Sequence, residues 1–155
     1  MKRHRALTAV LLAPVLALAS CGTQREFREV TIGPAKFREV YDAIDHVART
    51  DGFLLDPTES DAGYGIWQSR WRNVTLRLGR SGRYRLRAEI QDDKDLRKGY
   101  FMVLYCVEKQ EVKDLSRADR HTEDDWSPTG QDADREQIFR ERLVRQVRQP
   151  DPPRP

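Results

Sequence analysis

The sequence has few of the residues and motifs on which enzyme active sites are commonly built. It contains two cysteines and three histidines in 155 residues. It has no Gly-x-Ser-x-Gly turn, no glycine-rich phosphate loop and no zinc-ligand spacing. Its one apolar run, residues 6–18, is interrupted by Pro14 and is shorter than the about 20 residues that cross a bilayer. We therefore expect no transmembrane helix, no catalytic residue, no cofactor and no metal site, and hence no enzyme.

The N-terminal 21 residues carry the most informative pattern in the chain. A basic start and an apolar segment end in a short motif: Lys2, Arg3, Arg5, residues 6–18 and Leu18-Ala19-Ser20-Cys21. This arrangement resembles the signal peptide and lipobox of bacterial lipoproteins. The resemblance implies cleavage before Cys21, attachment of a diacylglycerol to its thiol and acylation of its new amine. We expect residues 1–20 to be a signal peptide and the protein to be anchored in the cell envelope through lipidated Cys21.

A cleaved signal without lipid remains an alternative, although a cysteine directly after Leu-Ala-Ser would then be a coincidence. In bacteria with two membranes, lipoproteins with Asp after the cysteine tend to stay in the inner membrane. Gly22 therefore favours the outer membrane, facing the periplasm, in such a host.

Residues 1–20 also account for the net charge. The chain has 28 basic and 25 acidic residues, a net charge of +3, and this segment holds three of the basic residues and none of the acidic ones. The remaining chain is formally neutral. Its charge gives no reason to expect nucleic-acid binding.

The rest of the chain predicts one domain. Residues 21–29 are a polar tether, residues 30–148 a single α+β domain and residues 149–155 a disordered proline-rich tail. If Cys21 carries lipid, Cys106 has no partner for a disulfide. The domain must then be held together by its apolar core.

Hydrophobic periodicity predicts two helices. In residues 34–50, apolar side chains recur every three or four residues, as on one face of a helix: Phe37, Val40, Tyr41, Ile44, Val47 and Ala48. Residues 132–148 show a second stripe: Ile138, Phe139, Leu143, Val144 and Val147.

Alternating patterns predict the strands. Residues 28–32 suit an edge strand, residues 53–55 a short strand, and residues 100–107, apolar on both faces, an internal strand. In a strand over residues 64–72, Trp67, Ser69 and Trp71 share one face, which the first helix would cover. Residues 92–95 form a polar turn.

A hairpin is expected around Arg80-Ser81-Gly82. Pairing Leu78 with Tyr84 and Gly79 with Arg83 places the apolar residues of both strands on one face and Gly82 at the left-handed position. In this register Arg77 lies opposite Arg85.

Together these elements predict an α+β fold, an antiparallel sheet of about four to five strands with one or two helices packed on one face. The order of an amphipathic helix, Asp51-Gly52-Phe53, a Gly65-Ile66-Trp67 strand and an arginine-rich hairpin resembles the helix-grip domains of outer-membrane assembly lipoproteins. The resemblance spans residues 30–107. It carries no functional residue to this chain.

Three residues are candidates for chemistry, each with a simpler structural interpretation. His46 lies near Asp42 and Asp45 but suits a solvated helix position, and His121 lies among carboxylates that lack the calcium-loop pattern. Cys106, between Tyr105 and Val107, suits a small core residue.

The arginines of the hairpin are the candidate docking face: Arg77, Arg83, Arg85 and Arg87. Arginine binds phosphate and carboxylate groups in a bidentate manner, so the expected partner is an envelope protein or an anionic polymer or headgroup. The simpler interpretation is that Glu89 and nearby acidic loops neutralise these charges. The sequence thus favours a non-catalytic, lipid-anchored interaction module. The alternative is a carrier of a lipid or other apolar ligand, held in a groove lined by Trp67, Trp71 and Tyr84.

Overall fold

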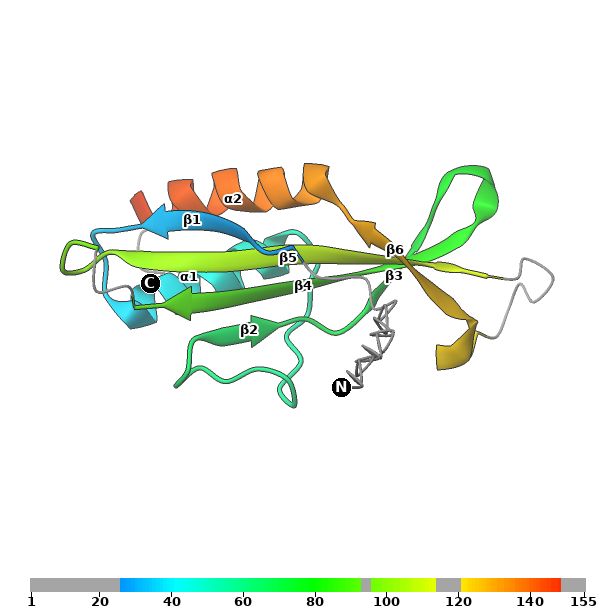
Figure 1. Cartoon of the computed structure of the whole chain (residues 1–155), viewed down its shortest axis with the longest axis horizontal. Coiled ribbons are helices and arrows are strands. Elements are labelled where there is room, and N and C mark those ends of the chain that lie inside the picture. The colour runs from blue at the N-terminus through cyan, green and yellow to red at the C-terminus, as the bar shows by residue number, and fades with distance from the viewer. Residues whose placement is uncertain (1–25, 93–95, 114–120, 149–155) are drawn as a thin grey trace, which may run out of the picture.

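The computed structural model describes residues 26–92, 96–113 and 121–148. These residues form an α+β fold with two helices and an open antiparallel sheet of six strands (Figure 1). In chain order the elements are β1 (Arg28–Ile32), α1 (Phe37–Thr50), β2 (Ile66–Gln68), β3 (Arg72–Thr75), the short 3₁₀ turn η1 (Arg77–Gly79), β4 (Ser81–Gln91), β5 (Phe101–Val112), the 3₁₀ turn η2 (Glu123–Asp125), β6 (Trp126–Gln131) and α2 (Ala133–Arg148). The predicted fold class is confirmed, with one strand more than expected.

Several predictions fall on parts of the chain outside the described residues. They are the signal peptide, the lipobox with Cys21, most of the tether, part of the turn at residues 92–95, and the proline-rich tail.

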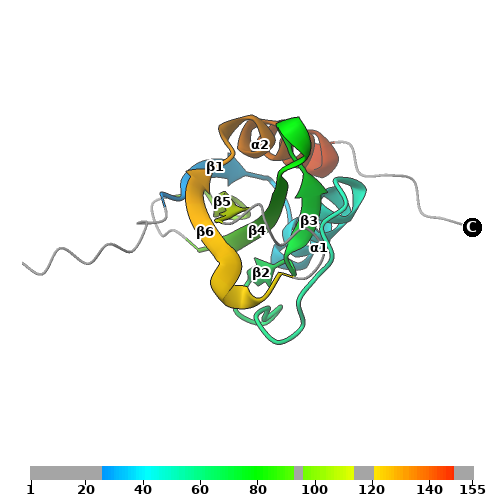
Figure 2. The same cartoon turned by 90° about the vertical axis from the view of Figure 1, so that its right-hand side faces the viewer.

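A long two-stranded ribbon of β4 and β5 forms the centre of the sheet. The ribbon pairs over ten residues, from Gly82 opposite Glu111 to Gln91 opposite Met102. β1 and β6 pair with β5, and β2 and β3 pair with β4. Viewed along the long axis, β6 and β3 flank the ribbon on opposite sides (Figure 2). The internal position predicted for the strand over residues 100–107 is confirmed, and so is the edge position of residues 28–32.

Both helices lie on one face of the sheet, which we call the helix face (Figure 2). The apolar core lies between this face and the helices and takes residues from both helices and from the strands. Among them are Val40, Ile44, Val47, Trp67, Leu86, Ala88, Val103, Tyr105, Val107, Phe139 and Leu143. Both predicted helices are confirmed, each beginning slightly later than expected. Ile138 is the exception in the second stripe, because it remains 44% exposed.

The α2 helix is also joined to the sheet through a buried carboxylate. Glu136 is 2% exposed. One of its oxygens accepts hydrogen bonds from the Val107 backbone N–H at 3.0 Å and from Gln131 at 2.8 Å, and the other lies 3.4 Å from the Arg28 guanidinium. Buried charge is tolerated where it is paired and hydrogen-bonded in this way. No helix among the described residues is long and apolar enough to cross a membrane.

Trp67 and Trp71 do not share a face, which corrects the expectation for the strand over residues 64–72. Trp67 pairs with Ala88 in β2, whereas Arg72 pairs with Tyr84 in β3. From Trp67 to Arg72 the chain advances five residues, whereas the paired segment of β4, from Ala88 to Tyr84, advances four. The extra residue reverses the face on which the following side chains lie. Trp71 consequently lies on the sheet face opposite the helices, here called the outer face.

The hairpin register also differs from the prediction. Tyr84 pairs with Arg72 rather than Leu78, and Val74 pairs with Gly82. The shift is an even number of residues, so Val74 and Leu76 still pack against the core as expected. The Gly82 position matters for a different reason than predicted: a Cβ there would lie 2.7 Å from Leu76 Cδ1, so glycine allows Leu76 to pack against β4.

Candidate functional site

The outer face carries a row of arginines along β4, each paired with a carboxylate. The Arg87 guanidinium contacts Glu89 at 2.7 Å and donates to Gln68 Oε1 at 3.0 Å. Arg85 contacts Glu108, its cross-strand neighbour on β5, at 2.6 Å. Opposite charges in such positions stabilise a sheet. This is the simpler of the two interpretations that the sequence left open.

Arg83, the third arginine of the row, is the most enclosed. Its Cζ lies 4.5 Å from the ring centroids of both Trp71 and Trp126, so the guanidinium packs against two indoles. Its Nε donates to Gln110 at 2.7 Å. Its two terminal nitrogens donate to the two carboxylate oxygens of Glu123 at 2.9 and 2.7 Å. Arg83 is 5% exposed, a degree of burial that arginine reaches only when its charge is satisfied.

Arg77 does not join the other three, which corrects the predicted docking face. It lies in η1, outside the strand, and is exposed. Arg85 is opposite Glu108 and not opposite Arg77. The predicted pairing of two facing arginines is therefore absent from the structure.

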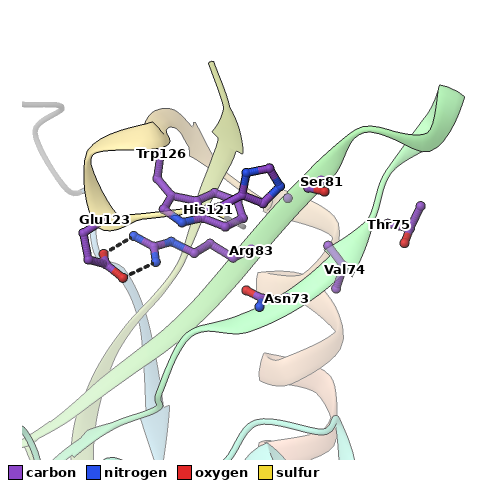
Figure 3. Close-up of a pocket in the computed structure, with 9 residues that line it drawn as sticks. Asn73, Val74, Thr75, Ser81, Arg83, His121, Glu123 and Trp126 are labelled. Atoms are coloured by element: carbon purple, nitrogen blue, oxygen red, sulfur yellow. Dashed lines mark hydrogen bonds and ion pairs between the residues drawn. The ribbon is translucent and has the colours of Figure 1, made fainter. Parts of the chain in front are cut away.

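A pocket of about 440 Å³ lies at the end of the β4–β5 ribbon, between the β3–β4 hairpin and the segment that leads into β6 (Figure 3). Its lining is mainly polar: Asn73, Val74, Thr75, Ser81, Gly82, Arg83, His121, Glu123 and Trp126. Its volume falls within the range of small-ligand pockets. The pair of Arg83 and Glu123 forms one side of it.

His121 adds a second polar group at this pocket. Its ring packs edge-on to Trp126 with centroids 5.5 Å apart. Both ring nitrogens are buried, and neither has a hydrogen-bond partner among the described residues. Buried polar atoms normally have a partner, so this histidine is suited to receive one.

The electrostatics of the pocket are set by the Arg83–Glu123 pair. Hydrogen bonds from Arg83 lower the pKa of the Glu123 carboxyl, with a smaller opposing effect of burial. Glu123 thus stays ionised at neutral pH. The pocket can present a bidentate cation, but only after this carboxylate moves away.

The other candidate residues stand apart from the pocket. His46 is half-buried on α1, and Cys106 is fully buried in β5. No group of three or more potential metal ligands occurs in the described part of the chain.

The groove expected for an apolar ligand does not form from the predicted residues. Trp67 and Tyr84 are 0% and 6% exposed and belong to the filled core, while Trp71 lies on the outer face. The three side chains therefore do not line one groove.

Neither Trp126 nor Glu123 was predicted from the sequence to contact the arginines. They lie 43 and 40 positions from Arg83, beyond the reach of periodicity arguments. One signal was available: Trp126 is a single large aromatic residue directly after an acidic run in a polar stretch.

No protein-family model matches this chain, and no curated protein matches it. The resemblance to assembly lipoproteins therefore stays a prediction.

Proposed function

We propose that the protein is a lipid-anchored lipoprotein of the bacterial envelope that acts as a non-catalytic interaction module. The observation that carries the proposal is the motif Leu18-Ala19-Ser20-Cys21 behind a basic and apolar N-terminus. Two or more acyl chains on Cys21 would make the anchor stable, because each buried methylene contributes about 0.8 kcal/mol.

The start of the folded domain supports this arrangement. Glu26 exchanges two hydrogen bonds with the Gln131 side chain, at 2.9 and 2.8 Å, where β1 and β6 meet. Glu26 is five residues after Cys21, and five extended residues reach about 18 Å. A lipidated Cys21 would thus hold this edge of the sheet close to the membrane surface.

The use of charged residues supports a non-catalytic role. The carboxylates nearest to the arginines of the outer face form ion pairs within the sheet, as in Arg85 with Glu108 and Arg87 with Glu89. The Arg85–Glu108 pair joins β4 to β5, whereas the Arg87–Glu89 pair lies within β4. The pocket beside Arg83 offers a recognition surface on this scaffold.

Metabolic labelling with an alkyne-bearing fatty acid tests the proposal in a bacterium that processes lipoproteins. The wild-type protein should incorporate the label and should leave the membrane fraction with detergent but not with concentrated salt. Cys21→Ser should lose the label. Cys106→Ala, which changes the other cysteine, should retain it. An unlabelled wild-type protein would contradict the proposal.

A further inference from the structure

The pocket beside Arg83 combines a fixed cation with an exchangeable partner. Arg83 packs against two indole rings and is held at Nε by Gln110, so its two terminal nitrogens point in a set direction. A guanidinium fixed in this way matches the planar, two-oxygen geometry of a carboxylate. In the structure the Glu123 carboxylate lies in this position, with both oxygens bound to the Arg83 terminal nitrogens.

Glu123 differs from the other carboxylates that pair with this row of arginines. The Glu108 and Glu89 side chains are 15% and 26% exposed and extend from long strands. The Glu123 side chain is 80% exposed and extends from a three-residue turn. Exposed ion pairs contribute little free energy. Arg83 is buried, whereas the carboxylate bound to it is exposed to solvent and open to competition from a second carboxylate.

The remaining lining suits a peptide. Strand β3, which supplies Asn73, Val74 and Thr75 to the pocket, pairs with β4 alone among the described strands. Its second edge leaves backbone N–H and C=O groups for an added extended chain, as in β-strand addition. The His121 nitrogens, which have no hydrogen-bond partner in the part of the chain that the structure describes, offer a further polar contact.

We propose that this pocket binds a carboxylate of an extended peptide from a partner protein, and that Glu123 occupies the carboxylate position until the ligand displaces it. The carboxylate can be a free C-terminus or an acidic side chain. The inference gives a ligand chemistry to the proposed interaction module and rests on it for its setting. Failure of the peptide-binding proposal can be told apart from failure of the proposed function, because fatty-acid labelling of Cys21 does not depend on the pocket.

The test uses the full chain, purified in detergent, and the indole N–H signals of its three tryptophans in ¹⁵N NMR spectra. The probes are a Gly-Ser peptide with a free C-terminus, its C-terminally amidated form, and an amidated form with one internal Glu. Either carboxylate peptide should shift the Trp71 and Trp126 signals, and comparing the two identifies the source of the carboxylate. Trp67, buried beneath α1, serves as the internal reference.

Matched variants test the displacement. Glu123→Ala removes the built-in competitor and should tighten binding by about fivefold, the equivalent of one exposed ion pair. Asp124→Ala removes the same charge from the same turn and should leave the affinity unchanged. Arg83→Lys keeps the positive charge but lacks the fork and should lose binding. If Arg83→Lys does not fold, the comparison of Glu123→Ala with Asp124→Ala still shows whether Glu123 competes with the peptide carboxylate.

Three results would overturn the proposal. They are equal affinity in the wild type and Glu123→Ala, equal binding of the neutral amidated peptide, and an absence of shifts at Trp71 and Trp126 with both carboxylate peptides.

Discussion

Trp67 and Trp71, four residues apart in the sequence, lie on opposite faces of the sheet. Trp67 is fully buried on the helix face, where its Nε1 donates to Asp45 on α1 at 3.0 Å. The Trp71 ring lies 4.5 and 4.4 Å from the Arg83 and Arg85 Cζ atoms on the outer face. One residue gained between β2 and β3 places one indole in the core and the other on the outer face.

This division predicts unequal effects of the two tryptophans on stability. Trp67→Ala should lower the free energy of unfolding by about 3–5 kcal/mol, because it leaves a cavity in the core. Trp71→Ala removes two cation–π contacts, each worth about 0.5–1 kcal/mol, and should lower it by about 1–2 kcal/mol. Urea denaturation measures both. Similar losses in the two variants would contradict the assignment of Trp71 to the outer face.

Two glycines with nearly the same backbone conformation should respond differently to alanine. Gly65 and Gly79 have φ of +70° and +73°, so alanine at either costs about 1–2 kcal/mol of backbone strain. A Cβ at Gly65 would lie 2.9 Å from Ile90 Cβ, whereas nothing lies within 4 Å of one at Gly79. Overpacking adds about 1–3 kcal/mol.

Gly65→Ala should therefore be the more destabilising substitution, as measured by thermal or urea unfolding. Gly79→Ala is its matched control for backbone strain. If the two variants were equally stable, the close packing of Gly65 against β4 would be wrong.

The Arg83–Glu123 pair predicts a pH dependence of a definite sign. The pKa of Glu123 is lower in the folded protein than its ordinary value of 4.5, chiefly because Arg83 donates hydrogen bonds to it. Its stabilising contribution is therefore present above the ordinary value and is lost as the pH falls through the folded-state pKa. Unfolding free energies of the wild type and Glu123→Ala should differ at neutral pH and converge in acid. A difference that stays constant with pH would contradict the ion pair.

The sequence predicted the elements whose signal is local and repeated. Both helices follow from periodicity, because a buried face requires apolar residues at fixed spacing. The internal strand β5 follows from a run that is apolar on both faces. Alternation also predicted that Val74 and Leu76 face the core, although the register was wrong, since a shift by an even number of residues keeps each side chain on its face. Leu78, which was expected on the same face, lies in η1 and is 97% exposed. The turn then forms around Leu78 and Gly79, which have positive φ, and not around Gly82.

The pocket was not predictable in this way. Alternation assumes an unbroken strand, so it placed Trp71 beside Trp67. Arg83 meets Trp126 and Glu123 only because β6 returns along the ribbon, and that contact depends on the tertiary fold. The arginine pattern was visible in the sequence, but the side chains that neutralise and enclose it come from other strands and turns.

The most direct measurement of the central claim is the mass of the N-terminal tryptic peptide of the protein isolated from bacterial membranes. Cleavage after Arg25 releases the segment from Cys21 to Arg25. Lipid anchoring predicts a peptide that begins at Cys21 and carries the mass of a diacylglyceryl group, with a further acyl chain on its amine. An N-terminus elsewhere in the chain, or a peptide beginning at Cys21 without lipid, would contradict the proposal of a lipid-anchored module.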